Sequence, residues 1–253
     1  MTLQHDEEHT DADNTLTVGE VVELLQEGEM EVLQLLPWSS NYTFLAKVKQ
    51  GDLVTLAVYK PRGGERPLWD FPRGTLYQRE VAAFVLSDAL GWNIVPPTVA
   101  RSGKHGTGMV QLFVEHDPEE NFFTFRDPWP EELTRMALFD VLINNADRKG
   151  GHCIRDVEGR IWGIDHGICF HEEPKLRTVI WELAGQRIPP ALLQDLGRLQ
   201  SCLQQGESPS DALAELLTRK EISALQRRLA SLIKKGRFPN PPSTRRHKPW
   251  AMV

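Results

Sequence analysis

Hydrophobic and polar residues follow two different periods along the chain, and the change of period divides it into two parts. Up to about residue 115, short runs rich in Val, Leu, Thr and aromatic residues are separated by turns with Gly, Asn or Asp, a pattern typical of antiparallel strands. Beyond that point, apolar residues recur mainly at helical spacing. The sequence therefore predicts an α+β protein with a strand-rich N-terminal lobe and a mainly helical C-terminal lobe.

The N-terminal part predicts one helix followed by a three-stranded meander. Thr17 and Glu20 have the spacing of a capping box, and the apolar residues after them end before Gly28, as expected for a short helix. We expect the strands over residues 31–36, 42–48 and 53–59.

A loop, a helix and two more strands complete this lobe. Residues 61–73 hold three prolines and two glycines, which predicts a loop. The next helix is expected to start near Thr75, with Gln78 as its capping partner, and to end at Gly91. The two strands are expected over residues 94–99 and 109–115.

The C-terminal part predicts helices around one short pair of strands. We expect an apolar, buried helix over residues 131–145 and a last helix between Thr218, which opens a capping box, and Gly236. The short strands are expected over 153–155 and 161–164. The predicted divisions are a disordered acidic tail (1–14), an N-terminal lobe (15–116), a C-terminal lobe (117–238) and a flexible Pro-rich tail (239–253).

Composition narrows the class of protein. The 253 residues are 40% hydrophobic and 25% charged, which excludes a wholly disordered or fibrous chain. A net charge of −6 argues against a nucleic-acid partner. Three cysteines without metal-binding spacing, and an acidic N-terminus without a signal sequence, favour the reducing cytoplasm. No apolar run is long enough to predict a transmembrane segment.

Polar residues suited to phosphoryl transfer occur at four places along the chain. Transfer from ATP needs small groups over the phosphates, a lysine fixed by a carboxylate, an acid beside the attacking hydroxyl, and oxygen ligands for Mg²⁺. Each feature alone is also compatible with an ordinary turn, a solvated edge or a surface ion pair. The four places are the turn Ser39–Ser40–Asn41, Lys60 with Glu80, the segment Asn145–His152, and Gly163–Gly167.

Asp165 is the most informative of these residues. It follows Ile164 in an apolar strand, where an unpaired carboxylate is costly and a metal ion or a lysine relieves that cost. A predicted strand–turn–strand separates it from Asp147 and returns both acids to the same end of the strand pair. The joint order of the four places therefore favours a functional interpretation.

Six stretches of the sequence resemble the phosphatidylinositol 3-/4-kinase catalytic domain superfamily, most closely the type II phosphatidylinositol 4-kinases and their small bacterial relatives. The resemblance spans about residues 38 to 172 and implies a bilobal, protein-kinase-like fold. The stretches are SSNYTFLAKV, AVYKPRGGERP, REVAAFVLSDALGWNIVPPT, VQLFVE, NNADRKGGH and GIDHGICF.

The resemblance implies how a nucleotide is held. The Ser39–Ser40–Asn41 turn is expected to lie over the phosphates, and Lys60 is expected to pair with the α- and β-phosphates and with Glu80. The hinge strand that holds adenine is expected to comprise Gln111, Leu112, Phe113 and Val114.

The resemblance also implies the residues of the chemical step. Asp147 is expected to be the catalytic aspartate and Asp165 the principal metal ligand. Where the family motif has an asparagine as second metal ligand, this chain has His152. Because imidazole suits Mn²⁺, Fe²⁺ or Zn²⁺ better than Mg²⁺, the sequence leaves open a shifted metal preference, impaired turnover, or a structural His152.

The sequence thus predicts a kinase that uses ATP with Mg²⁺ or Mn²⁺ to phosphorylate a hydroxyl acceptor. That acceptor is a lipid, a small alcohol or a protein Ser/Thr; the cysteine-rich insertion of type II enzymes is missing, so lipid specificity is not implied. Two alternatives stay open. One is a nucleotide-binding pseudokinase with a regulatory role, and the other is an enzyme that transfers AMP instead of phosphate.

Overall fold

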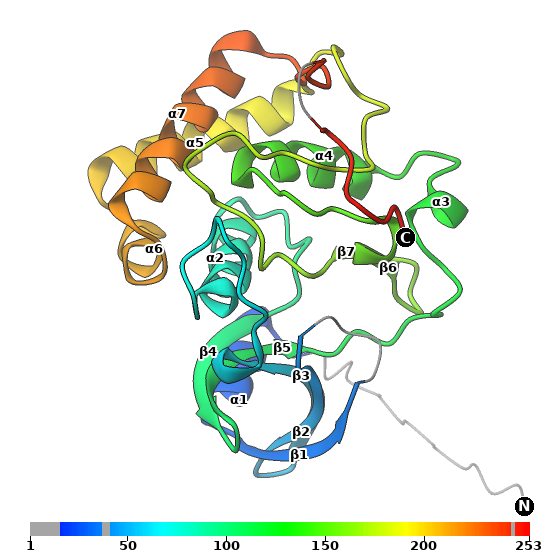
Figure 1. Cartoon of the computed structure of the whole chain (residues 1–253), viewed down its shortest axis with the longest axis vertical. Helices are drawn as coiled ribbons and strands as arrows, with labels where there is room; N and C mark the ends of the chain where they lie inside the picture. The colour runs from blue at the N-terminus through cyan, green and yellow to red at the C-terminus, as the bar shows by residue number, and fades with distance from the viewer. Residues whose placement is uncertain (1–15, 37–40, 244–245) are drawn as a thin grey trace, which may run out of the picture.

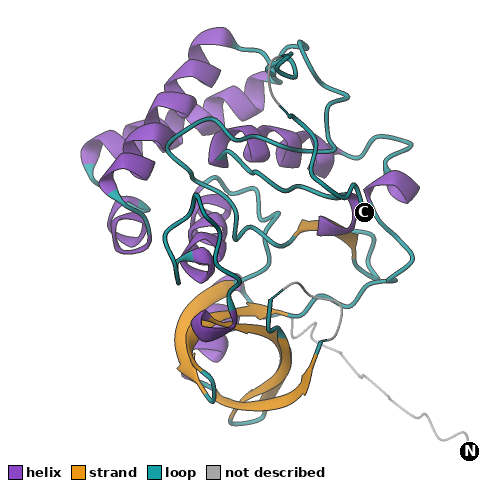
Figure 2. Cartoon of the chain, viewed as in Figure 1, coloured by secondary structure: helices purple, strands orange, loops and turns teal. Residues whose placement is uncertain are grey.

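The computed structural model describes residues 16–36, 41–243 and 246–253. In Figure 1, a curved sheet forms one lobe and a group of helices forms the other. Figure 2 shows the same division by secondary structure, and it confirms the predicted α+β fold. The acidic tail expected over residues 1–14 lies outside the described residues.

The sheet has the strand order β1–β2–β3–β5–β4, with every neighbouring pair antiparallel. It curves around α1 (Val18–Glu27), whose Leu24 and Leu25 are buried against it (Figure 1). The predicted capping box is confirmed, because Thr17 and Glu20 bond to each other in both directions. The strands are β1 Glu29–Leu35, β2 Phe44–Gln50, β3 Leu53–Pro61, β4 Thr98–Gly103 and β5 Gly106–Leu112.

The β4–β5 hairpin differs from the prediction in its position along the chain. We expected strands over 94–99 and 109–115, whereas the hairpin turns between Gly103 and Gly106. Pro96 and Pro97 lack the N–H groups that a ladder requires, so regular pairing begins only at Thr98.

Helix α2 (Leu76–Ala89) joins the two lobes. It contacts β4 and β5 on one side and α6 on the other, and its apolar face belongs to the core of the helical lobe. The prediction that Gln78 caps this helix is wrong. The carboxylate of Glu65 accepts hydrogen bonds from the N–H groups of Leu76 and Tyr77, at 3.2 and 2.8 Å.

The helical lobe is built around α4 (Glu131–Ile143), which is buried along most of its length. The last helix opens with the predicted Thr218–Glu221 capping box and ends at Gly236, where φ is 58°. Segment 246–253, part of the tail expected to be flexible over 239–253, contacts this lobe through the carbonyls of His247 and Met252. The remaining elements are α3 Phe122–Phe125, β6 Cys153–Arg155, β7 Ile161–Gly163, α5 Pro190–Gln205, α6 Ser210–Leu216, α7 Arg219–Lys235 and the short 3-10 turns Arg62–Gly64 and Gly150–His152.

An ion pair fixes α2 to the last helix. Arg79 of α2 donates from Nη2 to the Glu221 carboxylate of α7, and both side chains are buried. The other oxygen of Glu221 accepts from the N–H and hydroxyl of Thr218. Because a buried charge needs its partner, this pair sets the position of α2 on the helical lobe.

We expect Glu221→Gln to lower the free energy of unfolding by about 3 kcal/mol, because it leaves the Arg79 charge buried without a counter-charge. Lys220→Gln is the matched control: its side chain is 81% exposed, so a change within about 0.5 kcal/mol is expected. Urea unfolding of both variants measures the difference. Equal stabilities for the two variants contradict the role given to this pair.

Candidate active site

The side chain of Lys60 lies between two carboxylates from different lobes. Its Nζ is 2.7 Å from Glu80 Oε1 and 2.7 Å from Asp165 Oδ1. Lys60 is placed by the end of β3, Glu80 by α2, and Asp165 by the segment after β7. The residues that the sequence expected to act together therefore meet in the structure.

Charge pairing sets the protonation of these groups. Burial opposes the charged form of Lys60, but Asp165 and Glu80 outweigh it and raise the pKa of the ammonium. Lys60 in turn holds the pKa of Asp165 far below its ordinary value. Glu80 is fixed a second time, because its Oε2 accepts from the N–H of His166 at 2.7 Å. Lys60 and Asp165 are therefore a charged pair at neutral pH.

Asp165 has an unusual backbone conformation. Its φ is 61°, in the left-handed region that a non-glycine residue seldom adopts. The bond from His166 N–H to Glu80 lies immediately after this turn. Strain of this kind persists only where neighbouring contacts hold it and is common at functional sites.

The loop after α4, residues 144–152, carries Asp147. Because Asp147 is the expected catalytic aspartate, we call this segment the catalytic loop. Asn144 ends α4 with φ 56°, and Asn145 then accepts from the N–H of Asp147 at 2.9 Å. Burial raises the pKa of Asp147, and Lys149, whose Nζ lies 3.2 Å from Asp147 Oδ2, opposes that rise. A raised pKa suits a carboxylate that accepts a proton during the reaction.

Arg148 anchors the catalytic loop from inside the protein. Its guanidinium is fully buried and donates from Nε and Nη2 to the Asp140 carboxylate of α4, at 3.0–3.1 Å. The same group donates from Nη1 to the carbonyls of His152 (2.9 Å) and Ile164 (3.0 Å). Arg148 thereby ties the segment that carries Asp147 to the segment that carries Asp165.

One buried histidine, His166, and one half-buried histidine, His152, complete the interior of the site. His166 Nε2 lies 2.6 Å from Arg148 Nη2; because a guanidinium only donates, the His166 proton is on Nδ1. His152 Nδ1 accepts from the N–H of Lys149 at 3.4 Å, which places its proton on Nε2, 3.2 Å from Asp165 Oδ2. Burial lowers both pKa values, that of His152 to about 4.

The lysine and the three carboxylates of the site surround one cavity. Lys60, Glu80, Asp147 and Asp165 all line a space of about 180 Å³ between the two lobes. Asn41 lines it as well, whereas Ser39 and Ser40 lie outside the described residues. The cationic Arg66 and Lys149 also border it. The cavity therefore combines carboxylates with cations, as phosphate chemistry requires.

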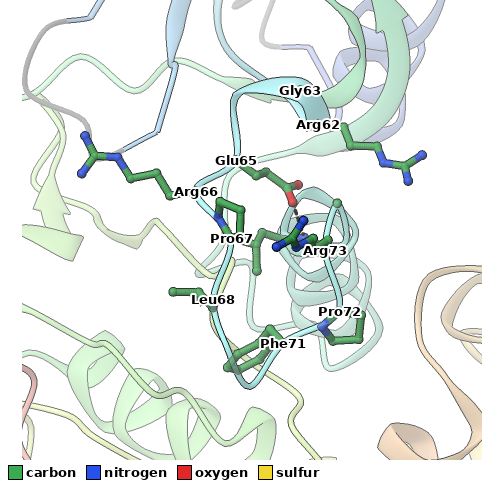
Figure 3. Close-up of a pocket in the computed structure, with 11 residues that line it drawn as sticks. Arg62, Gly63, Glu65, Arg66, Pro67, Leu68, Phe71, Pro72 and Arg73 are labelled. Carbon is green, nitrogen blue, oxygen red and sulfur yellow. Dashed lines mark hydrogen bonds between the residues drawn. The ribbon is translucent and has the colours of Figure 1, made fainter.

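The loop after β3 adds a second cavity of about 310 Å³ beside the first, and the two share Glu65, Arg66, Leu68 and Leu76 in their walls. Figure 3 shows Glu65 directed toward the start of α2, with Arg62 and Arg66 extending in opposite directions. The N–H of Arg66 donates to Asn41 Oδ1 at 2.9 Å. This loop therefore connects the turn before β2 to α2.

The expected hinge residues lie at and beyond the end of β5, outside the walls of the first cavity. Gln111 is buried and donates to the Thr98 hydroxyl at 2.8 Å, so its side chain acts within the sheet. The N–H groups of Leu112 and Phe113 donate to Pro97 and Leu56. In the described part of the chain, the N–H of Val114 has no acceptor.

Sequence reasoning missed the residues that support the site. Asp140 stands out in the sequence only as a charge within an apolar helix, yet it neutralises Arg148. Nothing in the sequence marks Glu65 as a helix cap, because capping patterns span three or four residues and the helix that Glu65 caps begins only after a long loop.

The comparisons with known sequences concern most of the chain. Residues 81–206 match the family model of phosphatidylinositol 3- and 4-kinases. Protein Rv2133c of Mycobacterium tuberculosis is 41% identical over 262 residues, covering 90% of this chain and 93% of that protein. Phosphatidylinositol 4-kinase gamma 4 of Oryza sativa subsp. japonica is 30% identical over 122 residues, covering 41% of this chain but 22% of the plant protein.

Two solved structures have a similar fold. The Helicobacter pylori proinflammatory kinase CtkA matches with a TM-score of 0.52 at 12% identity, covering 85% of this chain and 94% of that one. The hydra Fam20 structure with sugar matches with a TM-score of 0.51 at 16% identity, covering 86% and 88%. In the described ranges of the present chain, no helix has the length and apolarity to cross a membrane.

Protonation of His152 is expected to destabilise the metal-free protein in acid. Folding lowers the pKa of His152 from 6.5 to about 4. The neutral imidazole therefore contributes fully to the free energy of unfolding above pH 6.5, and this contribution is lost as the pH falls toward 4. The full contribution is about 3 kcal/mol. Urea unfolding between pH 4 and 7.5 is expected to show a shallower pH dependence for His152→Gln than for the unaltered protein. Parallel curves contradict this assignment.

Proposed function

Because the chain belongs to the phosphatidylinositol 3- and 4-kinase family, we propose that it is an ATP-dependent phosphotransferase. The γ-phosphate passes to a hydroxyl group of a lipid, a small alcohol or a protein Ser/Thr. The observation that carries this proposal is the placement of Lys60, between Glu80 and Asp165 at 2.7 Å from each, in the cavity that Asp147 also lines. The family match begins after Glu80, so the roles of Lys60 and Glu80 rest on this geometry.

In the proposed reaction, Lys60 binds the α- and β-phosphates while Glu80 keeps its ammonium in place. Asp147 orients the acceptor hydroxyl and takes its proton as the bond to the γ-phosphorus forms and the bond to the leaving ADP oxygen breaks. Lys149 lies beside Asp147 and offsets negative charge at the transferring group. Adenine is proposed to bind along Gln111–Val114, with the Val114 N–H as donor to the base.

Asp165 and His152 form the proposed metal site. Among the described residues, no group of three His, Cys, Asp or Glu side chains is arranged to hold a metal, so these two side chains would hold the ion together with phosphate oxygens and water. When bound, the metal supplies positive charge that neutralises the phosphates. His152 would hold it through Nε2. This requires the imidazole proton to move to Nδ1, which gives up both the bond from the Lys149 N–H at 3.4 Å and the contact of Nε2 with Asp165 Oδ2 at 3.2 Å.

A radioactive-label experiment tests the reaction class. The protein is incubated with γ-³²P-ATP or α-³²P-ATP, Mg²⁺ or Mn²⁺, and phosphatidylinositol vesicles, inositol or a Ser/Thr peptide. Label from the γ-position alone is expected. Asp147→Asn is expected to lower kcat by about 10²–10⁴-fold because the proton acceptor is lost, and Lys60→Met by about 10²–10³-fold.

Lys49→Met is the matched control for the lysine variant, because Lys49 is an exposed residue of β2 and full activity is expected. Label from the α-position indicates AMP transfer and contradicts the proposal. No transfer to any acceptor, with ATP-dependent thermal stabilisation that survives Asp147→Asn, identifies a pseudokinase instead.

His152 leads to a prediction about the metal. Imidazole binds Mn²⁺ better than Mg²⁺, whereas an amide oxygen suits Mg²⁺. We therefore expect higher activity and tighter binding with Mn²⁺, and a reversed preference in His152→Asn. Mn²⁺ binding followed by electron paramagnetic resonance measures the affinity independently of turnover. The same preference in both proteins contradicts ligation by His152.

A further inference from the structure

A segment distant in sequence contacts the catalytic loop. The N–H of Gly150 donates to the carbonyl of Met252 at 2.6 Å. Figure 1 shows the red C-terminal segment crossing the helical lobe to a point beside α3 and β6. Since Gly150 lies between Asp147 and His152, this bond holds the backbone of the proposed active site.

A second contact anchors the same segment. The carbonyl of His247 accepts from the N–H of Thr178 and from Trp181 Nε1, each at 3.1 Å. The rings of His247 and Trp181 also meet edge to face, with centroids 5.8 Å apart. The neighbouring backbone pairs with the catalytic loop, because Val179 N–H donates to the carbonyl of Arg148. The segment thus contacts the loop both directly and through residues 177–179.

The segment has internal structure of its own. Arg246 donates to the carbonyls of Lys248 and Pro249, at 2.9 and 2.8 Å. Its guanidinium also lies over the Trp250 ring, 4.4 Å from the centroid, and Pro249 is buried. These contacts reduce the entropy that the segment loses on binding to the lobe.

Two glycines lie where the segment meets the catalytic loop. Gly150 and Gly151 are adjacent, and glycine has more conformational freedom than other residues. The glycine at position 150 is imposed by packing, because a Cβ there would lie 2.8 Å from the Phe123 ring. A larger residue at position 150 would restrict the backbone, but the Phe123 ring leaves no room for its Cβ. The hydrogen bond to Met252 restrains this backbone in another way.

We propose that residues 246–253 form a strap that positions Asp147 by restraining the catalytic loop at Gly150. The strap residues are positioning residues. The side chains that line the cavity carry the proposed chemistry. The inference rests on the proposed function, because it assigns the strap a part in phosphoryl transfer. Release of the strap lowers turnover, and nucleotide binding between Lys60 and the hinge stays nearly unchanged.

Truncation after Pro249 tests the strap, because it removes the Met252 carbonyl and leaves the His247 contacts. The rate of amide exchange at Gly150 is expected to rise by about 3- to 10-fold, and kcat is expected to fall by about the same factor. This factor corresponds to the net free energy of one hydrogen bond. KM for ATP is expected to stay constant. Met252→Ala keeps the carbonyl and is the matched control, with both quantities unchanged.

Trp181→Phe in the full-length chain gives a second measurement that does not depend on folding of the truncated protein. It removes the N–H that binds His247, and faster exchange at Thr178 with a smaller fall in kcat is expected. Unchanged exchange at Gly150, or an unchanged or raised kcat after truncation, overturns the strap. A full-length chain that phosphorylates none of the acceptors refutes the proposed function instead, and Gly150 exchange still reports whether the contact exists.

Discussion

The buried guanidinium of Arg148 is the constraint on which the site depends. A charge without access to water is tolerated only when its hydrogen bonds are satisfied, and here the acceptors come from three segments: Asp140 of α4, the carbonyl of His152 and the carbonyl of Ile164. The loop after α4 and the turn after β7 must therefore meet around it. Asp147 precedes Arg148 and Asp165 follows Ile164, so both acids reach the cavity.

Helix α2 holds the sheet and the helical lobe together, as Arg148 holds the two loops. Its neighbouring residues Arg79 and Glu80 contact different partners: Arg79 binds Glu221 of the last helix, and Glu80 binds Lys60 of the sheet. The apolar face of α2 packs in the core of the helical lobe. These three contacts hold α2 in one place and fix Glu80 beside Lys60, so in the proposed reaction the ammonium needs little reorganisation to meet the phosphates.

The sequence predicted the features that depend on local patterns. Strand and helix order follows from hydrophobic period, and the capping boxes at Thr17 and Thr218 follow from spacing within one turn. Features made by distant partners were not predictable. Glu65 caps a helix from a preceding loop, and the strap binds through the backbone carbonyls of His247 and Met252. Backbone acceptors leave no side-chain pattern, so a Pro-rich composition indicated only flexibility.

The backbone at position 152 is held independently of the side chain. Arg148 binds the His152 carbonyl, and any residue at this position presents the same acceptor. The imidazole is therefore not needed for the contact with Arg148. Burial keeps it neutral, its pKa being about 4, so Asp165 faces one cation, Lys60, and one neutral donor. The neutral imidazole thus adds no positive charge beside the Asp165 carboxylate.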